Sequence, residues 1–130
     1  MNLLICGSRT IAGADVQIMR ALLHFGLSPD TISSGGGGAV DLAADQYARE
    51  RGLRFRVILA DWNLHGRSAG MIRNEKLVKE VDAVLAIWDG QSPGTKHVME
   101  RAWRRNIPVY LATVRTEYAV TTNTPNEGPL

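Results

Sequence analysis

Short apolar stretches alternate with segments of helical periodicity along most of this 130-residue chain. Strands that alternate with helices of about 10 to 15 residues predict right-handed crossovers, which build a parallel sheet with helices on both faces. The chain therefore predicts an α/β three-layer sandwich around a five-stranded, mainly parallel sheet. The expected strands are residues 2–6, 31–33, 55–60, 82–88 and 107–111.

Two of these strands, at residues 57–60 and 83–87, are almost continuously apolar, as is typical of strands that helices cover on both sides. The later helices are expected near residues 69–80 and 95–105. A chain of this length holds one compact core. We therefore predict one domain over residues 1–113 and a C-terminal tail over residues 114–130, as well as helices near residues 16–25 and 40–48.

A run of four glycines, Gly35–Gly38, follows the second expected strand and leads directly into the second helix. Glycine has no Cβ atom, so the backbone can adopt positive φ there and bring several N–H groups close to an anion. The helix that follows adds the positive end of its dipole. The run predicts a phosphate-binding loop, and a flexible glycine-rich connection is the alternative.

The basic residues are mostly arginine, which makes up twelve of fifteen, and the formal net charge is only +2. Arginine favours bidentate recognition of anions over diffuse attraction. The densest basic cluster, residues 49–56, could touch a nucleic-acid backbone, but a solvated helix end explains it as well. With two Phe, three Tyr and three Trp the chain has few platforms for base stacking, so nucleic acid is not an expected main partner.

The N-terminal segment lacks the basic start and long apolar region of a signal peptide, and no apolar run approaches the roughly 18 residues that span a bilayer. We therefore expect a cytoplasmic protein with no membrane partner. The single cysteine, Cys6, lies in an apolar run and is interpreted as a buried structural thiol. His24 and His97 show no metal-ligand spacing, so neither a metal site nor a cofactor is expected.

Four loops rich in Gly, Ser, Arg and Asp follow the first four expected strands, at residues 7–10, 35–38, 61–68 and 89–95. In parallel sheets the ligand lies outside the carboxyl ends of the strands, where the strand order reverses. All four loops should meet at that edge. Turn formation alone does not require arginines there, so this convergence is the main sequence signal for a binding site.

The loop motifs, in this order, resemble the SLOG superfamily over about residues 2–112, and most nearly its small single-domain YspA-like branch. The likeness implies a Rossmann-like fold that binds nucleotides or nucleotide-derived signals. Relatives in the superfamily include cytokinin-activating phosphoribohydrolases and the DNA-processing protein that binds single strands. The motifs that carry the likeness are Gly7-Ser8-Arg9, the glycine loop of residues 34–41, Ala60-Asp61-Trp62, Gly66–Asn74 and Asp89–Thr95.

The glycine loop departs from the superfamily pattern Gly-Gly-Ala-x-Gly-x-Asp. Gly37 stands at the Ala position and Ala39 at the third Gly, whereas Gly35, Gly36 and Asp41 match. The methyl group of Ala39 leaves less room for a ligand to approach the backbone. Because a carboxylate in the first turn of a helix suits the helix dipole, Asp41 either serves the helix or holds a ribose hydroxyl.

Arg67 and Arg73 are the expected phosphate contacts. Arg67 precedes the third helix and Arg73 lies one to two turns inside it, so both can reach a ligand at the N-terminal end of that helix. Solvated side chains are the alternative. Asn74 either reads a base or ribose edge with its amide or lies on the helix surface. Trp62 either stacks on a base or fills space between a loop and a helix.

The phosphoribohydrolase and deoxyribosyltransferase relatives carry a Gly-Thr-x-x-Glu pattern, whose carboxylate acts on an N-glycosidic bond. Here Gly94 and Thr95 are followed by Val98 at the carboxylate position, and Glu100 should face elsewhere on the helix. Asp89 either substitutes for that carboxylate or caps a turn. Binding without turnover is the preferred prediction. N-glycosidic or phosphoester hydrolysis of a nucleotide is the alternative.

The sequence therefore predicts a sensor or sequestering protein, expected to be a homodimer, that binds a small nucleotide or nucleotide-derived signalling ligand at the C-terminal edge of the sheet. Single-stranded nucleic acid is a less favoured ligand. In this hypothesis glycine backbone and a hydroxyl hold the phosphate and arginines neutralise it. The predicted ligand-binding residues are Gly7, Ser8, Arg9, Gly35, Gly36, Asp41, Trp62, Arg67, Arg73, Asn74, Asp89, Ser92, Gly94 and Thr95.

Overall fold

Strands and helices alternate along the chain as predicted in a computed structural model, which describes residues 1–115 and 117–122. A 3-10 turn, η1 (Gly66–Ser68), lies between the third and fourth helices. The other elements are β1 (Asn2–Gly7), α1 (Ala14–Phe25), β2 (Thr31–Ser34), α2 (Ala39–Glu50), β3 (Arg54–Val57), α3 (Trp62–His65), α4 (Ala69–Val78), β4 (Ala83–Trp88), α5 (Pro93–Arg104), β5 (Val109–Thr113) and β6 (Tyr118–Thr121).

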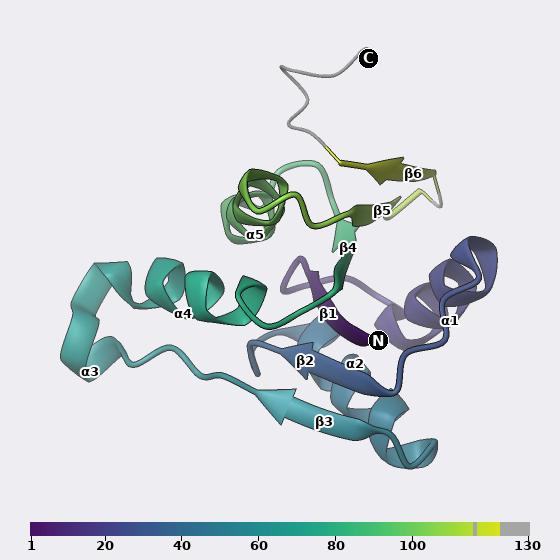
Figure 1. Ribbon diagram of the computed structural model, residues 1–130, viewed down its shortest axis with the longest axis horizontal. Coiled ribbons are helices and arrows are strands. Elements are labelled where there is room, and N and C mark those ends of the chain that lie inside the picture. The colour runs from purple at the N-terminus through teal and green to yellow at the C-terminus, as the bar shows by residue number, and fades with distance from the viewer. Residues whose placement is uncertain (116, 123–130) are drawn as a thin grey trace.

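These strands form one sheet in the order β3-β2-β1-β4-β5-β6 (Figure 1). The strands from β3 to β5 run parallel, and β6 pairs antiparallel with β5. The strand order reverses between β1 and β4, where Ile5 is in register with Leu85. In such sheets the ligand crevice lies outside the carboxyl ends of the strands at this switch point.

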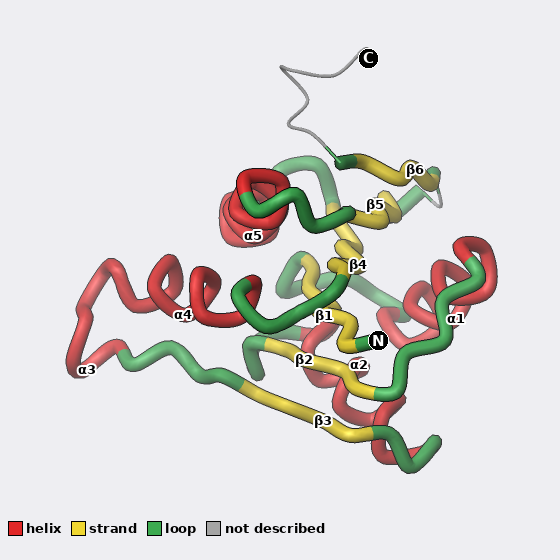
Figure 2. Tube along the Cα trace, viewed as in Figure 1, coloured by secondary structure: helices red, strands yellow, loops and turns green. Residues whose placement is uncertain are grey.

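Helices cover both faces of the sheet (Figure 2). Successive residues of β1 point to opposite faces, so Leu3 and Ile5 pack in the cluster that includes α1 and α2. Leu4 and Cys6 pack in the cluster that includes α4 and α5. The predicted burial of Cys6 is confirmed, and burial raises the pKa of its thiol well above the ordinary value.

The sheet has one strand more than the five that the sequence predicts. Residues 118–121, expected in the tail, form β6 at the edge of the sheet. The ring of Tyr118 stacks on His24 of α1 with centroids 4.2 Å apart. Trp103 of α5 donates its Nε1–H to Thr121 Oγ1 at 2.9 Å. These side-chain contacts secure the added strand. Within the expected tail, residues 116 and 123–130 lie outside the described residues.

Strand β3 is shorter and less buried than predicted. It ends at Val57, because Ile58 N–H makes the last bond to β2, at Ser34 O. Val57 and Leu59 are exposed, so the expectation of burial on both sides is wrong for residues 57–60. The reason is that β3 is an edge strand, with a neighbouring strand on one side only. After β3 the polypeptide leaves the sheet.

The chain between β3 and α4 projects beyond the carboxyl ends of the strands, with α3 at its far end (Figure 1). We call residues 59–71 the projecting arm.

Helix α4 ends at Val78, two residues earlier than expected. Helix α5 begins at Pro93, whose fixed φ suits the first turn of a helix. In the described part of the chain no helix combines the length and apolarity needed to cross a membrane.

Candidate functional site

The glycine loop, Gly35–Gly38, packs backbone to backbone against the loop after β1. Gly36 and Gly38 have φ values of 71° and 47°, which favour glycine. A Cβ atom on Gly38 would lie 2.9 Å from the Cα atom of Arg9. Ala39 N–H donates to Arg9 O at 3.0 Å. The glycines therefore allow two loops at the carboxyl edge to approach each other closely.

Two backbone N–H groups of the glycine loop donate hydrogen bonds to side chains of the residues that flank the loop. Gly36 N–H donates to Ser34 Oγ at 3.0 Å. Gly37 N–H donates to Asp41 Oδ2 at 2.8 Å. The carboxylate in the first turn of α2 thus takes a position beside the loop where an anion would bind.

Arg73 joins the second turn of α4 to the glycine loop. Its Nη1–H donates to Gly35 O at 3.0 Å, and its Nε–H donates to Asn74 Oδ1 at 2.8 Å. A Cβ atom on Gly35 would lie 2.6 Å from Nη1 of Arg73, so the guanidinium fills the space that glycine leaves. The α4 helix therefore delivers a half-buried cation to the end of β2.

Three charged groups interact around this loop. Burial raises the pKa of the Asp41 carboxyl, and the Gly37 N–H, Arg73 and Arg9 oppose that rise. Burial also lowers the pKa of the Arg73 guanidinium, with Asp41 opposing this effect and Arg9 adding to it. Two cations thus act on one carboxylate. The set carries a net positive charge, which favours one further anion.

A second cluster ties the loop after β1 to the loop after β4. Ser8 is only 1% exposed, and its hydroxyl accepts from Asp89 N–H at 3.1 Å and from Ser92 Oγ–H at 2.9 Å. The Asp89 carboxylate accepts the N–H groups of Gln91 and Ser92 at 2.8 Å each. These bonds, led by that of Ser92, lower the pKa of Asp89 to about 2. Asp89 therefore organises its own loop.

The N-terminus of α5 follows this cluster directly. Ser92 is its N-cap residue and makes no side-chain cap hydrogen bond. A Cβ atom on Gly94 would meet nothing within 4 Å, whereas Thr95 is buried. The first turn of this helix thus adds backbone N–H groups and a positive dipole end close to Ser8.

Gly7 has a packing role that sequence reasoning did not identify. A Cβ atom at this position would lie 2.5 Å from Val40 Cγ2 and 2.6 Å from Ile87 O. The absence of a side chain therefore lets α2 approach β1 and β4 at the switch point. Its predicted contact with a ligand remains a prediction.

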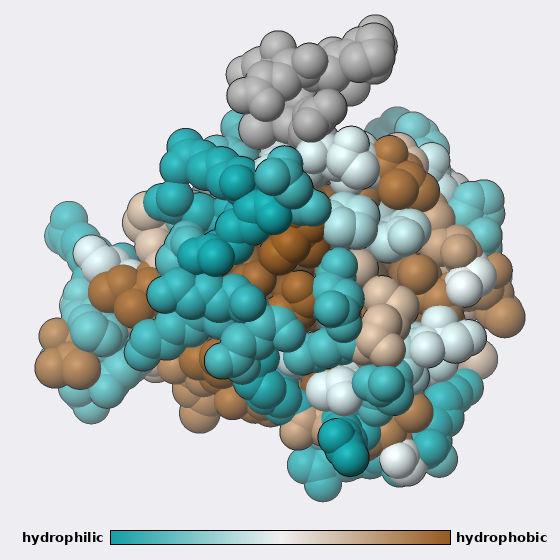
Figure 3. Space-filling view, in the orientation of Figure 1, coloured by the Kyte–Doolittle hydropathy of each residue, from teal (hydrophilic) through white to brown (hydrophobic). Residues whose placement is uncertain are grey.

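Trp62 and Arg67 are not brought to the glycine loop. Both are exposed: Trp62 belongs to α3, the element at the far end of the projecting arm (Figure 1), and Arg67 belongs to η1, which follows it. Trp62 is 58% exposed and lies beside Gly70, with Cη2 3.6 Å from the position of a Cβ atom there. Figure 3 shows apolar surface at this end of the molecule. Leu64 and Met71 of the arm are exposed apolar residues. The predicted ligand contacts of Trp62 and Arg67 remain predictions.

Two residues next to the candidate site were missed by sequence reasoning. Leu59 of the arm lies against the glycine loop, since its Cδ2 is 2.5 Å from the position of a Cβ atom on Gly36. His97 of α5 shares a hydrogen bond with Asn74, Nδ1 to Nδ2, at 3.1 Å. Asn74 itself is buried between α4 and α5 and does not lie on a helix surface. No local pattern reveals contacts between separate elements.

Arginines of the basic cluster at residues 49–56 are engaged within the protein. Arg49 pairs with Asp45 at 2.6 Å and Arg56 with Glu80 at 2.6 Å. The guanidinium of Arg51 lies 4.0 Å from the centroid of the Tyr47 ring. These contacts agree with the interpretation of the cluster as a solvated helix end.

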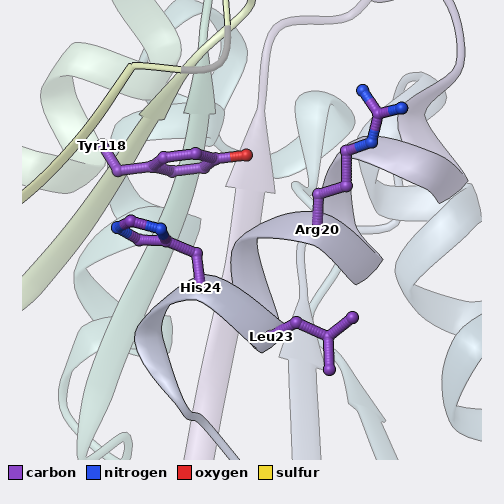
Figure 4. Close-up of a pocket in the computed structure, with 4 residues that line it drawn as sticks. All are labelled: Arg20, Leu23, His24 and Tyr118. Carbon is purple, nitrogen blue, oxygen red and sulfur yellow. The ribbon is translucent and has the colours of Figure 1, made fainter.

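A separate depression of about 530 Å³ opens between α1 and β6 (Figure 4). It is lined by Arg20, Leu23, His24 and Tyr118, with the His24 and Tyr118 rings parallel. It lies away from the loops at the carboxyl edge and is broadly open to solvent. The charge arrangement around the glycine loop is therefore the stronger indication of a ligand site.

In residues 1–115 and 117–122, His, Cys, Asp and Glu side chains form no group of three that could hold a metal ion.

No family model matches the chain. The Gene 61 protein of Mycobacterium phage D29 is 40% identical over 81 residues, which cover 58% of this chain and 65% of that protein. This chain thus spans just under two thirds of the length of that curated relative.

Two solved structures share the fold. The X-ray structure of TM1055 has a TM-score of 0.62 at 19% identity, covering 83% of this chain and 71% of that one. DNA processing protein A from Helicobacter pylori, whose structure describes a single-stranded DNA binding mode, has a TM-score of 0.65 at 18% identity, covering 85% and 64%. The fold is Rossmann-like. This likeness confirms the predicted fold class, while membership of the SLOG superfamily and of its YspA-like branch remains a prediction.

Proposed function

We propose that this protein binds a small nucleotide or nucleotide-derived signalling ligand, through its phosphate, at the carboxyl edge of the sheet. The observation that carries the proposal is the pair of guanidinium groups, Arg9 and Arg73, that act on a single carboxylate beside a loop of four glycines. A phosphate there would complete the charge balance. Arginine is well suited to this role because its planar fork matches phosphate oxygens.

The remaining contacts would come from the switch point. The first turn of α5, with open space at Gly94, offers backbone N–H groups and a positive dipole end for phosphate. Thr95 lies in the same turn and would add its hydroxyl. We place Ser8, Asp89 and Ser92 in a supporting role, since their side chains already bond one another.

Binding without turnover is part of the proposal. Phosphoribohydrolase-like relatives have a carboxylate where this chain has Val98, which is buried in α5. Asp41 and Asp89, the carboxylates among the predicted site residues, each accept backbone N–H groups of their own loop. We therefore favour a sensor or sequestering protein, as a cytoplasmic homodimer of the YspA-like branch, over a nucleotide hydrolase.

Single-stranded DNA is the second candidate ligand, because the Helicobacter pylori protein of similar fold is described as binding it. The internal pairing of Arg49 and Arg56 argues against this candidate. Any DNA binding is expected to be weak and strongly dependent on salt, as is typical of phosphate-backbone contacts without base stacking.

Thermal melts with mononucleotides, NAD, ADP-ribose and cyclic dinucleotides test the proposal. A ligand at a hundredfold excess over its Kd should stabilise the native state by about 2.7 kcal/mol. Arg9→Ala should reduce that stabilisation, whereas Arg20→Ala, a matched exposed arginine on α1, should not. Mass spectrometry of the denatured protein would identify a co-purified nucleotide. The absence of any thermal shift or calorimetric heat across the panel would refute nucleotide binding, and tight DNA binding at physiological salt would favour the second candidate.

A further inference from the structure

A chain of hydrogen bonds runs from the glycine loop to the outer helix α5. Arg73 Nη1–H donates to Gly35 O at 3.0 Å, and Arg73 Nε–H donates to Asn74 Oδ1 at 2.8 Å. The amide nitrogen of Asn74 in turn lies 3.1 Å from Nδ1 of His97. Asn74 is only 4% exposed, so solvent does not readily replace these partners.

The donors and acceptors between Arg73 and His97 follow from the chemistry of the three side chains. A guanidinium only donates, so the Asn74 atom that faces Arg73 must be the carbonyl oxygen. The atom that faces His97 is then the NH2 group, which also only donates. Nδ1 of His97 must therefore carry a lone pair, and the neutral ring bears its proton on Nε2. The intact series of hydrogen bonds from the glycine loop to α5 requires a neutral His97.

The surroundings of His97 also disfavour its charged form. Burial and Arg101 lower its pKa, while Glu100 and Glu75 raise it and Arg104 lowers it. Glu75 belongs to α4, and the other three charged groups belong to α5. Arg101 Nε–H donates toward Nε2 of His97 at 3.3 Å, so both ring nitrogens face donors. The same Nε lies 3.2 Å from Glu75 Oε2, and this carboxylate can take the Arg101 donor when Nε2 bears the proton. Arg101 therefore does not need the imidazole as a partner.

We propose that His97 and Asn74 are positioning residues, and that protonation of His97 removes one of the two hydrogen bonds that hold Arg73 beside the glycine loop. A protonated His97 presents Nδ1–H to the Asn74 NH2 group, which cannot accept it. The amide can restore this contact only by rotating its oxygen toward His97. It then withdraws the acceptor of Arg73 Nε–H, and the guanidinium keeps only its bond to Gly35.

The effect on ligand affinity rests on the function proposed above, but the hydrogen-bond link itself does not. Protonation of His97 should therefore weaken nucleotide binding through Arg73, without His97 touching the ligand. Acidification would then act as a release signal for a phosphate ligand.

The link can be tested by NMR on the full chain without any ligand. The Arg73 Nε–H resonance, assigned by its loss in Arg73→Lys, should move with the same midpoint as the His97 ring resonances. It should stop moving with pH in His97→Gln. His65→Gln, which changes a histidine of the projecting arm, should leave its movement unchanged.

A second variant tests the donor assignment. In Asn74→Asp the carboxylate can accept from both Arg73 and a protonated His97, so the proton affinity of His97 should rise about tenfold and Arg73 should no longer follow its titration. An Arg73 resonance that ignores His97 in the wild-type protein, or that still titrates in His97→Gln, would overturn the proposal. Titration with 5′-AMP at neutral and acid pH is a separate measurement: failure of 5′-AMP to bind at either pH would count against the proposed function and leave the NMR result standing.

Discussion

The carboxylate of Asp41 accepts a hydrogen bond from the backbone N–H of Gly37 at 2.8 Å, four residues earlier in the chain. This bond folds the glycine loop back onto the first turn of α2, where a carboxylate also suits the helix dipole. The same bond occupies an N–H group that could otherwise face a phosphate. The loop therefore already contains an anion of its own, and two arginines neutralise it.

Asp41→Asn should increase the affinity for inorganic phosphate about tenfold, because it removes one negative charge near the incoming anion. The pKa of Asp41 is raised in the folded state, so its contribution to stability is complete below its unfolded pKa and is lost as pH rises through its folded pKa. At neutral pH the melting temperature of the variant should therefore equal or exceed that of the wild type. Calorimetric titration and thermal melts measure both quantities.

Asp45→Asn is the matched control for this change, since Asp45 lies on the same helix and pairs with Arg49. Its phosphate affinity should equal that of the wild type. If Asp41→Asn instead lost affinity for 5′-AMP and kept its affinity for phosphate, Asp41 would hold a ribose hydroxyl.

Arg73→Ala should weaken nucleotide binding by about 2–5 kcal/mol, because the phosphate loses its partner in a partly desolvated site. It should also lower the free energy of unfolding by about 1–3 kcal/mol, because the buried Asn74 Oδ1 loses its donor. Arg73→Lys keeps the charge without the fork and should recover only part of the affinity. Arg67→Ala, on the exposed arm, is the control for stability and should melt like the wild type. Unchanged affinity in Arg73→Ala would assign the residue a purely structural role.

Gly35→Ala should reduce nucleotide affinity while the protein still folds. The added methyl group would lie 2.6 Å from Arg73 Nη1, the end of a flexible side chain that can move away. Gly70→Ala in α4 is the matched control, because the added methyl group would make only an ordinary contact, 3.6 Å from Trp62 Cη2. It should keep the affinity and raise the stability by about 0.4–1 kcal/mol. Equal affinities of the two variants would show that the position of Arg73 does not matter for binding.

The parallel part of the fold could be predicted because its signal is local. Strands β1, β4 and β5 coincide with apolar runs, which are typical of parallel strands buried on both faces. Strand β6 escaped prediction because its order depends on contacts with other elements. Tyr118 stacks on α1 and Thr121 is held by Trp103 of α5. The sequence predicts a buried strand that includes Leu59, because nothing in the sequence around it indicates that β3 lies at an edge of the sheet.

The candidate site divides in the same way. The glycine run is a sequence signal, and the structure places Arg9, Arg73 and Asp41 around it. The bond between Asn74 and His97 joins two helices across 23 residues of sequence, so neither periodicity nor spacing could indicate it. Pairings of this kind depend on how α4 and α5 pack, which only the folded structure determines.

Asp89→Asn should flatten the acid limb of the stability curve. The pKa of Asp89 is lowered from 3.8 to about 2 in the folded state, chiefly by the N–H groups of Ser92 and Gln91. A lowered pKa contributes stability that is present above the unfolded value and is lost as pH falls through the folded one. The variant should thus be less stable than the wild type at neutral pH, and the difference should shrink between pH 3.8 and about 2. Urea unfolding across this range provides the measurement.

Asp61→Asn is the control. Asp61 is the N-cap residue of α3 and accepts the backbone N–H of Leu64. Asn caps a helix as well as Asp does, so this change keeps the hydrogen bond. If the wild type and Asp89→Asn lost stability in parallel on acidification, the charge of Asp89 would not hold the loop after β4.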